Sequence, residues 1–165
     1  MTVRPLVYWP DARLSQRCAP VPGDEDVAGL VADMFDTMYA AKGRGLAAPQ
    51  IGVMQRVFVM DAGWKDGAPT PMACVNPVVS GAGDVIDIDE MCLSVPDLVV
   101  PVLRPQASSL IYEDAATRLP VSISLTGAEA RIAQHEADHL DGVLHLDRID
   151  PNLRADLLAS YEAKP

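Results

Sequence analysis

The segment HEADHLDGVLH, residues 135–145, contains every histidine of the 165-residue chain. His135 and His139 are four residues apart, so on a helix their side chains would share one face and could bind one metal ion together. Glu136 follows the first histidine and could accept a proton from a water molecule at that ion. The pattern H-E-x-x-H therefore predicts a catalytic metal site on a helix.

Two residues compete for the place of the third protein ligand. His145 would complete the three-histidine site of one class of zinc protease, but that class also has a methionine turn after its third histidine. This chain has no methionine after Met91. Cys92 is the better candidate, because a thiol beside a divalent metal loses its proton and becomes a strong ligand. The zinc protease that uses His145 remains as an alternative function.

Composition and charge limit the remaining function classes. The formal net charge of −10 opposes binding to phosphate backbones and to anionic lipid, so we expect no nucleic acid and no membrane as direct partner. The first residues lack the apolar run of a signal peptide, and no window approaches a membrane span of about 20 apolar residues. A single domain, residues 1–165, in the cytoplasm is expected.

Helix signals occur near both ends of the chain. A 3.6-residue apolar repeat after acidic residues predicts a helix over 25–41, and the glycine-rich segment 42–52 is expected to be non-helical. A capping box of Thr126 and Glu129 predicts a second helix, which carries the histidines and ends at Gly142. Asp150, as N-cap before Pro151, predicts a short helix over 152–163.

Strand candidates cluster between the two longer predicted helices. Because the strands do not alternate with helices, the fold class is predicted to be α+β with a mainly antiparallel sheet, and Pro120 makes its segment an edge strand or the start of a strand. The strand candidates cover residues 56–61, 72–77, 84–89, 98–103, 109–114 and 119–125.

Three segments resemble the three motifs of the peptide deformylases, in order and in spacing: GRGLAAPQ (43–50), EMCLS (90–94) and QHEADH (134–139). The resemblance extends to WPDARL (9–14), DMFDTMYAAKG (33–43) and LDGVLHLDRI (140–149), and so covers nearly the whole chain. It implies an α+β fold with mainly antiparallel sheets around a central metal-binding helix. It also implies removal of the N-formyl group from the initiator methionine of nascent polypeptides.

The resemblance assigns roles to individual residues. Glu136 would shuttle the proton, while the Gln50 side chain and the backbone N–H of Leu93 would donate to the formyl oxygen. Gly43 and Gly45 would lie along an N-formylmethionyl peptide that pairs with the backbone like an added strand. One divalent metal ion, iron(II) in the cell with zinc, nickel and cobalt also accommodated, would be bound by Cys92, His135 and His139.

Four residues depart from the family pattern. Met91 stands where the second motif has glycine, Arg44 replaces an aliphatic residue, Val99 stands at a place where arginine is common, and His145 replaces an aromatic residue. The Met91 side chain is expected either to narrow the substrate pocket or to pack into the core. A deformylase-like metal-binding protein without catalysis, or with altered specificity, is therefore a second alternative function.

Overall fold

In the computed structural model, which describes residues 2–163 and 165, the strands form one five-stranded antiparallel sheet in the order β1-β2-β3-β4-β5. Helices and strands are mixed without regular alternation, which confirms the predicted α+β class. The strands are β1 (Gly45–Ala47), β2 (Val57–Met60), β3 (Met72–Cys92), β4 (Val95–Asp114) and β5 (Pro120–Thr126).

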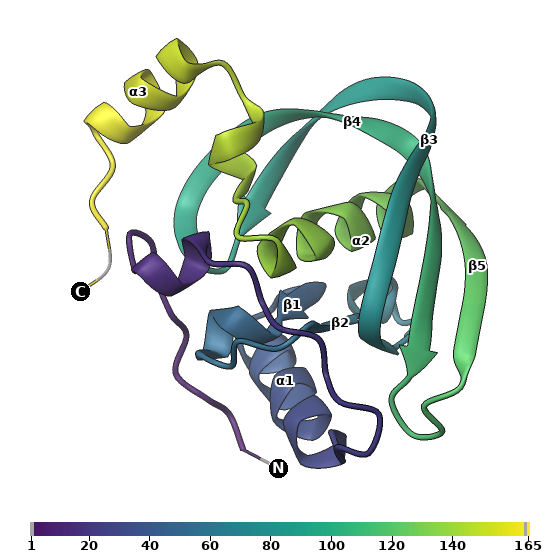
Figure 1. Ribbon diagram of the computed structural model, residues 1–165. Coiled ribbons are helices and arrows are strands. Elements are labelled where there is room, and N and C mark those ends of the chain that lie inside the picture. Colours follow the sequence, from purple (N-terminus) through teal and green to yellow (C-terminus); the bar gives the residue numbers. More distant parts are fainter. Residues whose placement is uncertain (1, 164) are drawn as a thin grey trace.

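The helices surround the sheet unequally. Figure 1 shows α2 crossing the middle of the molecule under the long, curved β3–β4 ribbon, with α1 next to β1 and β2, and α3 at the periphery. None of the helices in residues 2–163 and 165 is long and apolar enough to cross a membrane. The helices are α1 (Ala28–Ala40), α2 (Gly127–Leu140) and α3 (Pro151–Ala159), and short 3-10 turns are η1 (Ala12–Ser15), η2 (Ala48–Ile51), η3 (Trp64–Asp66) and η4 (His145–Arg148).

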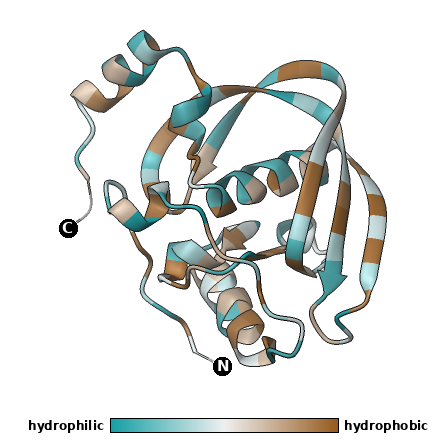
Figure 2. Cartoon of the chain, viewed as in Figure 1, coloured by the Kyte–Doolittle hydropathy of each residue, from teal (hydrophilic) through white to brown (hydrophobic). Residues whose placement is uncertain are grey.

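The two longest strands correct the sequence-based prediction. The candidates at 72–77 and 84–89 are one strand, β3, and those at 98–103 and 109–114 are one strand, β4. The strand continues between these two candidates through a shift of register between Ala82 and Val85, where Gly83 has a φ of 77°. The segment at 119–125 is the edge strand β5, with its hydrophobic and hydrophilic residues alternating in Figure 2, although Leu119 precedes it and is exposed.

Several helix predictions also change in detail. Thr126 is the N-cap of α2, but its side chain makes no capping hydrogen bond, so the predicted capping box is wrong. The segment predicted to contain no helix includes the short 3-10 turn η2. The C-terminal helix begins as predicted, with Asp150 accepting from the N–H groups of Asn152 and Leu153, but it ends at Ala159.

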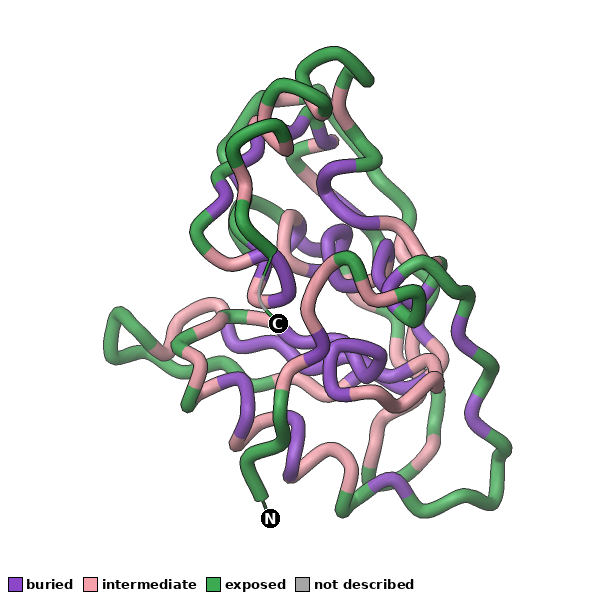
Figure 3. The backbone as a smooth tube through the Cα atoms, turned by 90° about the vertical axis from the view of Figure 1, so that its left-hand side faces the viewer, coloured by how far each residue is buried: buried purple, intermediate pink, exposed green. Residues whose placement is uncertain are grey.

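Buried apolar residues cluster between α2 and the sheet, between α1 and the strands β1 and β2, and around β4 and η4. Buried segments occupy the middle of the molecule in Figure 3, and exposed segments lie toward its ends. All four residues of β2 are apolar and buried, as expected for a strand that is covered on both faces. In α2, eight residues are buried although the helix is polar in composition, so its inner face must carry buried polar groups. Those groups form the functional site.

Candidate metal centre

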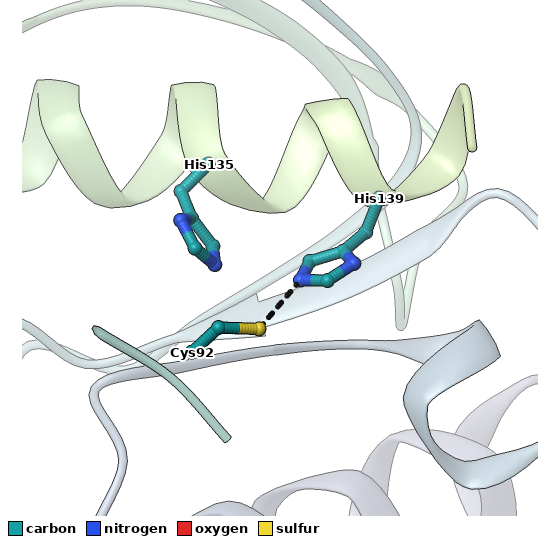
Figure 4. Close-up of side chains that lie close together, drawn as sticks. All are labelled: Cys92, His135 and His139. Carbon is teal, nitrogen blue, oxygen red and sulfur yellow. Dashed lines mark hydrogen bonds between the residues drawn. The ribbon is translucent and has the colours of Figure 1, made fainter. Parts of the chain in front are cut away.

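Three side chains from two elements converge in the interior. The ligand atoms of Cys92, His135 and His139 all lie within 4.8 Å of one another, and the three residues are buried. Figure 4 shows the two imidazoles and the sulfur directed toward one another, with Cys92 Sγ 3.3 Å from His139 Nε2. One thiol and two imidazoles are preferred donors for zinc and other divalent transition metals. The residues present therefore fit a divalent metal ion.

Local structure explains this convergence. His135 and His139 are one turn apart on α2, and their ring centroids are 5.1 Å apart. Cys92 is the last residue of β3, where a register shift between Glu90 and Cys92 ends the regular pairing with β4. Burial lowers the pKa of His139 well below its ordinary value, so its imidazole stays neutral, the form that binds metal.

His145 lies beside this cluster but is not part of it among the described residues. It begins the 3-10 turn η4, and its ring packs edge-on against His135 with centroids 5.8 Å apart. Burial lowers the pKa of His145 to about 3, so the ring is neutral at physiological pH. Neither ring nitrogen has a hydrogen-bond partner in residues 2–163 and 165. The structure thus places this histidine against a candidate ligand, in the position of an aromatic residue.

Glu136 is a buried carboxylate next to the candidate ligands. Its Oε1 atom is 4.0 Å from His135 Nε2, and its Oε2 atom has no hydrogen-bond partner among the described residues. Burial raises the pKa of the Glu136 carboxyl to about 7, because desolvation disfavours the charged form. Such a group can accept a proton and return it near neutral pH. Gly45 leaves room for it, since a Cβ there would lie 2.9 Å from Oε1.

The Gln50 amide is held beside the sulfur. Its Oε1 atom accepts from the N–H of Ala47 at 2.9 Å, and its Nε2 atom donates to Ser94 Oγ at 3.0 Å and lies 3.7 Å from Cys92 Sγ. These contacts fix which end of the amide faces the candidate centre. Leu93, between β3 and β4, has a backbone N–H that donates to no acceptor in the described chain. The Leu93 N–H is available to an oxygen atom of a substrate, and the Gln50 Nε2 group could donate to one in exchange for its long hydrogen bond to Cys92 Sγ.

A cavity of about 830 Å³ opens onto this centre. Gly43, just before β1, and Gly45, in β1, line it together with Leu93 and Glu136. At Gly43 the backbone approaches closely, because a Cβ there would lie 2.6 Å from Leu93 Cδ1. The sequence-predicted substrate and catalytic residues therefore line one cavity together with two of the candidate ligands, Cys92 and His135, while His139 is not among the residues that line it.

Met91 also lines the cavity, and its side chain is 62% exposed. The alternative that this side chain packs into the core is wrong. Met91 is not one of the described residues with a positive φ. A methionine at the position of the family's glycine therefore causes no strain from a left-handed backbone conformation. Arg44 lies on the same cavity, with a long ion pair of 3.8 Å to the exposed Asp66. Val99 is exposed and is not among the residues that line the cavity.

Glu90, which was not predicted from the sequence as a site residue, orients a candidate ligand. Its Oε1 atom accepts from His135 Nδ1 at 2.8 Å, and its carboxylate also binds Arg104 at 2.5 Å and Arg131 at 2.5 Å. Burial opposes ionisation of Glu90, but the hydrogen bonds from His135 and Arg104 outweigh it and lower its pKa. The sequence did contain a signal for this role. Residues i and i+2 of a strand share a face, and Glu90 precedes the candidate ligand Cys92 by two residues.

Comparisons with known proteins agree with this geometry. Residues 3–155 match the family model described as polypeptide deformylase. A peptide deformylase of Prochlorococcus marinus subsp. pastoris is 41% identical over 127 residues, which cover 76% of this chain and 63% of that protein. Peptide deformylase 2 of Gloeobacter violaceus is 41% identical over 142 residues, 85% of this chain and 75% of that protein. The chain thus spans less than two thirds of the Prochlorococcus relative.

Solved structures show the same fold. A peptide deformylase from Legionella pneumophila superposes with a TM-score of 0.87 at 36% identity, over 96% of this chain and 92% of that one. One from Synechococcus elongatus in complex with actinonin has a TM-score of 0.87 at 35% identity, over 94% of this chain and 86% of that one. With a thiol and two imidazoles converging under a cavity and a family match over most of its length, this chain belongs to the polypeptide deformylase family.

Proposed function

We propose that the protein is a metal-dependent peptide deformylase. It adds water to the formyl amide of an N-formylmethionyl peptide and releases formate and the free amino terminus. The observation that carries this proposal is the buried carboxylate of Glu136, whose Oε2 atom has no hydrogen-bond partner among the described residues, beside the Cys92, His135 and His139 cluster and in the lining of a cavity large enough for a peptide. Nascent polypeptides in the cytoplasm are the proposed substrates, with residues 1–165 acting as one catalytic unit.

Cys92, His135 and His139 would hold the metal ion, iron(II) in the cell, with zinc, nickel or cobalt as alternatives. A divalent ion supplies Lewis acidity there, which favours ionisation of water and polarises a carbonyl oxygen. Glu90 holds the His135 ring by its Nδ1 atom and leaves Nε2 for the ion. The buried Arg104 and the partly buried Arg131 keep the Glu90 carboxylate ionised and in place.

Glu136 moves the proton in this proposal. Its carboxylate takes a proton from the attacking water and delivers it to the leaving amine nitrogen as the C–N bond breaks. A pKa raised to about 7 suits both steps, because the group must be deprotonated before the attack and an effective acid after it. Burial at 4% exposure keeps bulk water from competing for that proton.

Gln50 and Leu93 would stabilise the charge that develops on the formyl oxygen. The Gln50 amide is already oriented by Ala47 and Ser94, so Nε2 need only exchange its long hydrogen bond to Cys92 Sγ for one to that oxygen, and the Leu93 N–H is held by the backbone. Removal of one such donor typically costs about 100- to 1000-fold in turnover. The peptide itself would pair with the free edge of β1 near Gly45.

A second candidate function is favoured by Met91. A side chain 62% exposed at the cavity can shorten the space for the substrate methionine, so the protein would bind metal but act poorly, or on a smaller first residue. A zinc protease is disfavoured, because the ligand atoms of His145 are outside the cluster among the described residues.

One experiment separates these functions. Formate release from formyl-Met-Ala-Ser is measured anaerobically with ferrous ion, in the wild type and in Glu136→Gln, with formyl-Ala-Ala-Ser and an unformylated peptide as parallel substrates. Deformylase activity on formyl-methionine that disappears in the variant supports the proposal. Bound metal without formate from any formyl peptide supports the non-catalytic alternative, and internal cleavage of the unformylated peptide supports a protease.

A further inference from the structure

Three exposed cations line the substrate cavity: Lys42, Arg44 and Lys65. They come from two segments that are bonded to each other, since the indole N–H of Trp64 donates to the carbonyl of Gly43 at 2.8 Å. Side chains that are exposed and also line a cavity lie at its opening. We call these three residues the cationic rim.

The protein itself neutralises the cationic rim only weakly. The Arg44 side chain is 41% exposed, and its one ion pair among the described residues is a contact of 3.8 Å with Asp66, whose side chain is 74% exposed. A long ion pair between two exposed groups contributes little. Lys42 makes no ion pair within the described part of the chain, and the Lys65 ammonium lies 5.7 Å from the centroid of the Trp64 ring. The charge of the rim is therefore available to a bound molecule.

The other charges of the cavity come from different elements. Asp89 on β3 and Asp97 on β4 are exposed acids of the lining, and its fourth cation, Arg131, already binds Glu90 at 2.5 Å. The chain as a whole has a formal net charge of −10 and repels acidic peptides at long range. Charges beyond about 8 Å are largely screened at physiological ionic strength. An acidic side chain at the cationic rim is therefore attracted by its neighbours more than it is repelled by the rest of the chain.

Arg44 is the member of the rim closest in the chain to the reacting groups. It precedes Gly45, where a Cβ would lie 2.9 Å from Glu136 Oε1. One residue of a strand advances by about 3.3 Å, so the Arg44 backbone lies one such step from the residue that contacts the proton-transfer group. A guanidinium can also bind a carboxylate through two parallel hydrogen bonds, which a lysine cannot do.

We propose that Arg44 is a specificity-determining residue that favours formylated peptides with an acidic side chain at the second or third residue. This inference rests on the proposed deformylase function. Lys42 and Lys65 add positive charge around the carboxylate, while Arg44 makes the direct contact. Because Arg44 stands where the family pattern has an aliphatic residue, this preference belongs to this chain and not to the family pattern.

The test compares glutamate with glutamine, which has nearly the same shape but no charge. Formyl-Met-Glu-Ser and formyl-Met-Gln-Ser vary the second residue, and formyl-Met-Ala-Glu and formyl-Met-Ala-Gln vary the third, all with amidated carboxyl ends. In the wild-type holoenzyme, kcat/KM should be about 1.5- to 5-fold higher for glutamate at one or both positions, as expected for an exposed ion pair. The difference should arise in KM and disappear at about 1 M salt, where the screening length is about 3 Å.

Arg44→Leu removes the guanidinium and provides an aliphatic side chain. Its glutamate-to-glutamine ratio should fall to one or below, because the net negative charge of the chain then acts on glutamate without the opposing contact. The variant should fold, since the Arg44 side chain is exposed and its ion pair is long. Arg17→Leu is the matched control. It changes the net charge equally, but Arg17 is exposed and does not line the cavity, so the wild-type ratio should remain.

Two results overturn the inference. A wild-type ratio of one or below at both positions would show that the rim does not select acidic peptides. A preference for glutamate that persists in Arg44→Leu would show that another cation selects them. A wild type inactive on every formyl peptide is a different result, which refutes the deformylase proposal itself. A ratio taken within one enzyme is insensitive to a general loss of stability or of active fraction, and the wild-type ratio requires no variant.

Discussion

Replacement of Gly45 by alanine tests the placement of the proton-transfer group. The new Cβ would lie 2.8 Å from Ile132 Cγ2 and 2.9 Å from Glu136 Oε1. Since non-bonded heavy atoms prefer about 3.5–4.0 Å, the Glu136 carboxylate must move by roughly 0.5–1 Å. A misplacement of about 1 Å at a reacting group can cost about 100-fold in rate, so kcat should fall by about two orders of magnitude.

Stability should change far less than turnover. Both clashing atoms are ends of side chains, and Gly45 has no positive φ that would strain an alanine, so the overpacking cost is about 1–3 kcal/mol. Gly29→Ala is the matched control, because a Cβ at this α1 position has no atom within 4 Å. That variant should keep wild-type kcat and gain about 0.5–1 kcal/mol of stability, as glycine is unfavourable within a helix.

The assay combines formate release, metal content and thermal unfolding on both alanine variants and the wild type. Gly45→Ala should retain one metal ion per chain, since none of the three atoms nearest its Cβ belongs to Cys92, His135 or His139. If Gly45→Ala kept full metal and near-wild-type kcat, the position of Glu136 would not limit the reaction, and the proton-transfer role assigned to it would be refuted.

Further predictions concern the same centre. Glu136→Gln should keep the metal and the melting temperature but lose turnover by about 100-fold or more, and near-native formate release would contradict its role. Elemental analysis should find the metal largely lost from Cys92→Ser and retained in His145→Ala; the reverse pattern would exclude the proposed ligand set. Glu90→Gln should weaken metal affinity by about 10- to 100-fold in a competition titration with a chelator, whereas unchanged affinity would mean that this carboxylate does not orient the His135 ligand. Met91→Gly should lower KM for formyl-methionine peptides at a stability cost of about 1 kcal/mol, because the side chain is 62% exposed; unchanged KM would show that it does not narrow the pocket.

Local sequence patterns predicted those parts of the fold that depend on neighbouring residues. The histidine helix α2, the edge strand β5 and the Asp150 cap of α3 each follow from spacing or from a side chain that bonds to the next turn. Strand length did not follow, because continuation of β3 through Gly81 and Gly83 depends on pairing with β4, about 25 residues away in the chain. A β-bulge accommodates the irregular residues within the strand, and a short stretch of sequence does not reveal that the strand will continue past them.

The candidate site shows the same division. His135 and His139 are one helix turn apart, so the sequence alone predicts that they share a face of the helix. The network around Glu90 is not, because it joins β3 to Arg104 on β4 and Arg131 on α2 through hydrogen bonds across 14 and 41 residues. Buried charges need such partners, but composition alone does not reveal which charges are buried.

The literal three-histidine pattern of the sequence has a structural explanation in Gly142. The α2 helix ends at Leu140, and Gly142 turns the chain with a φ of 74°. A Cβ at Gly142 would lie 2.7 Å from the backbone of Ser15, so the close approach of the η1 turn excludes any side chain there. The chain then enters η4 and places His145 edge-on against the His135 ring. The glycine of the pattern is thus required by a turn and by packing, and a zinc protease site is not needed to explain the spacing of His145.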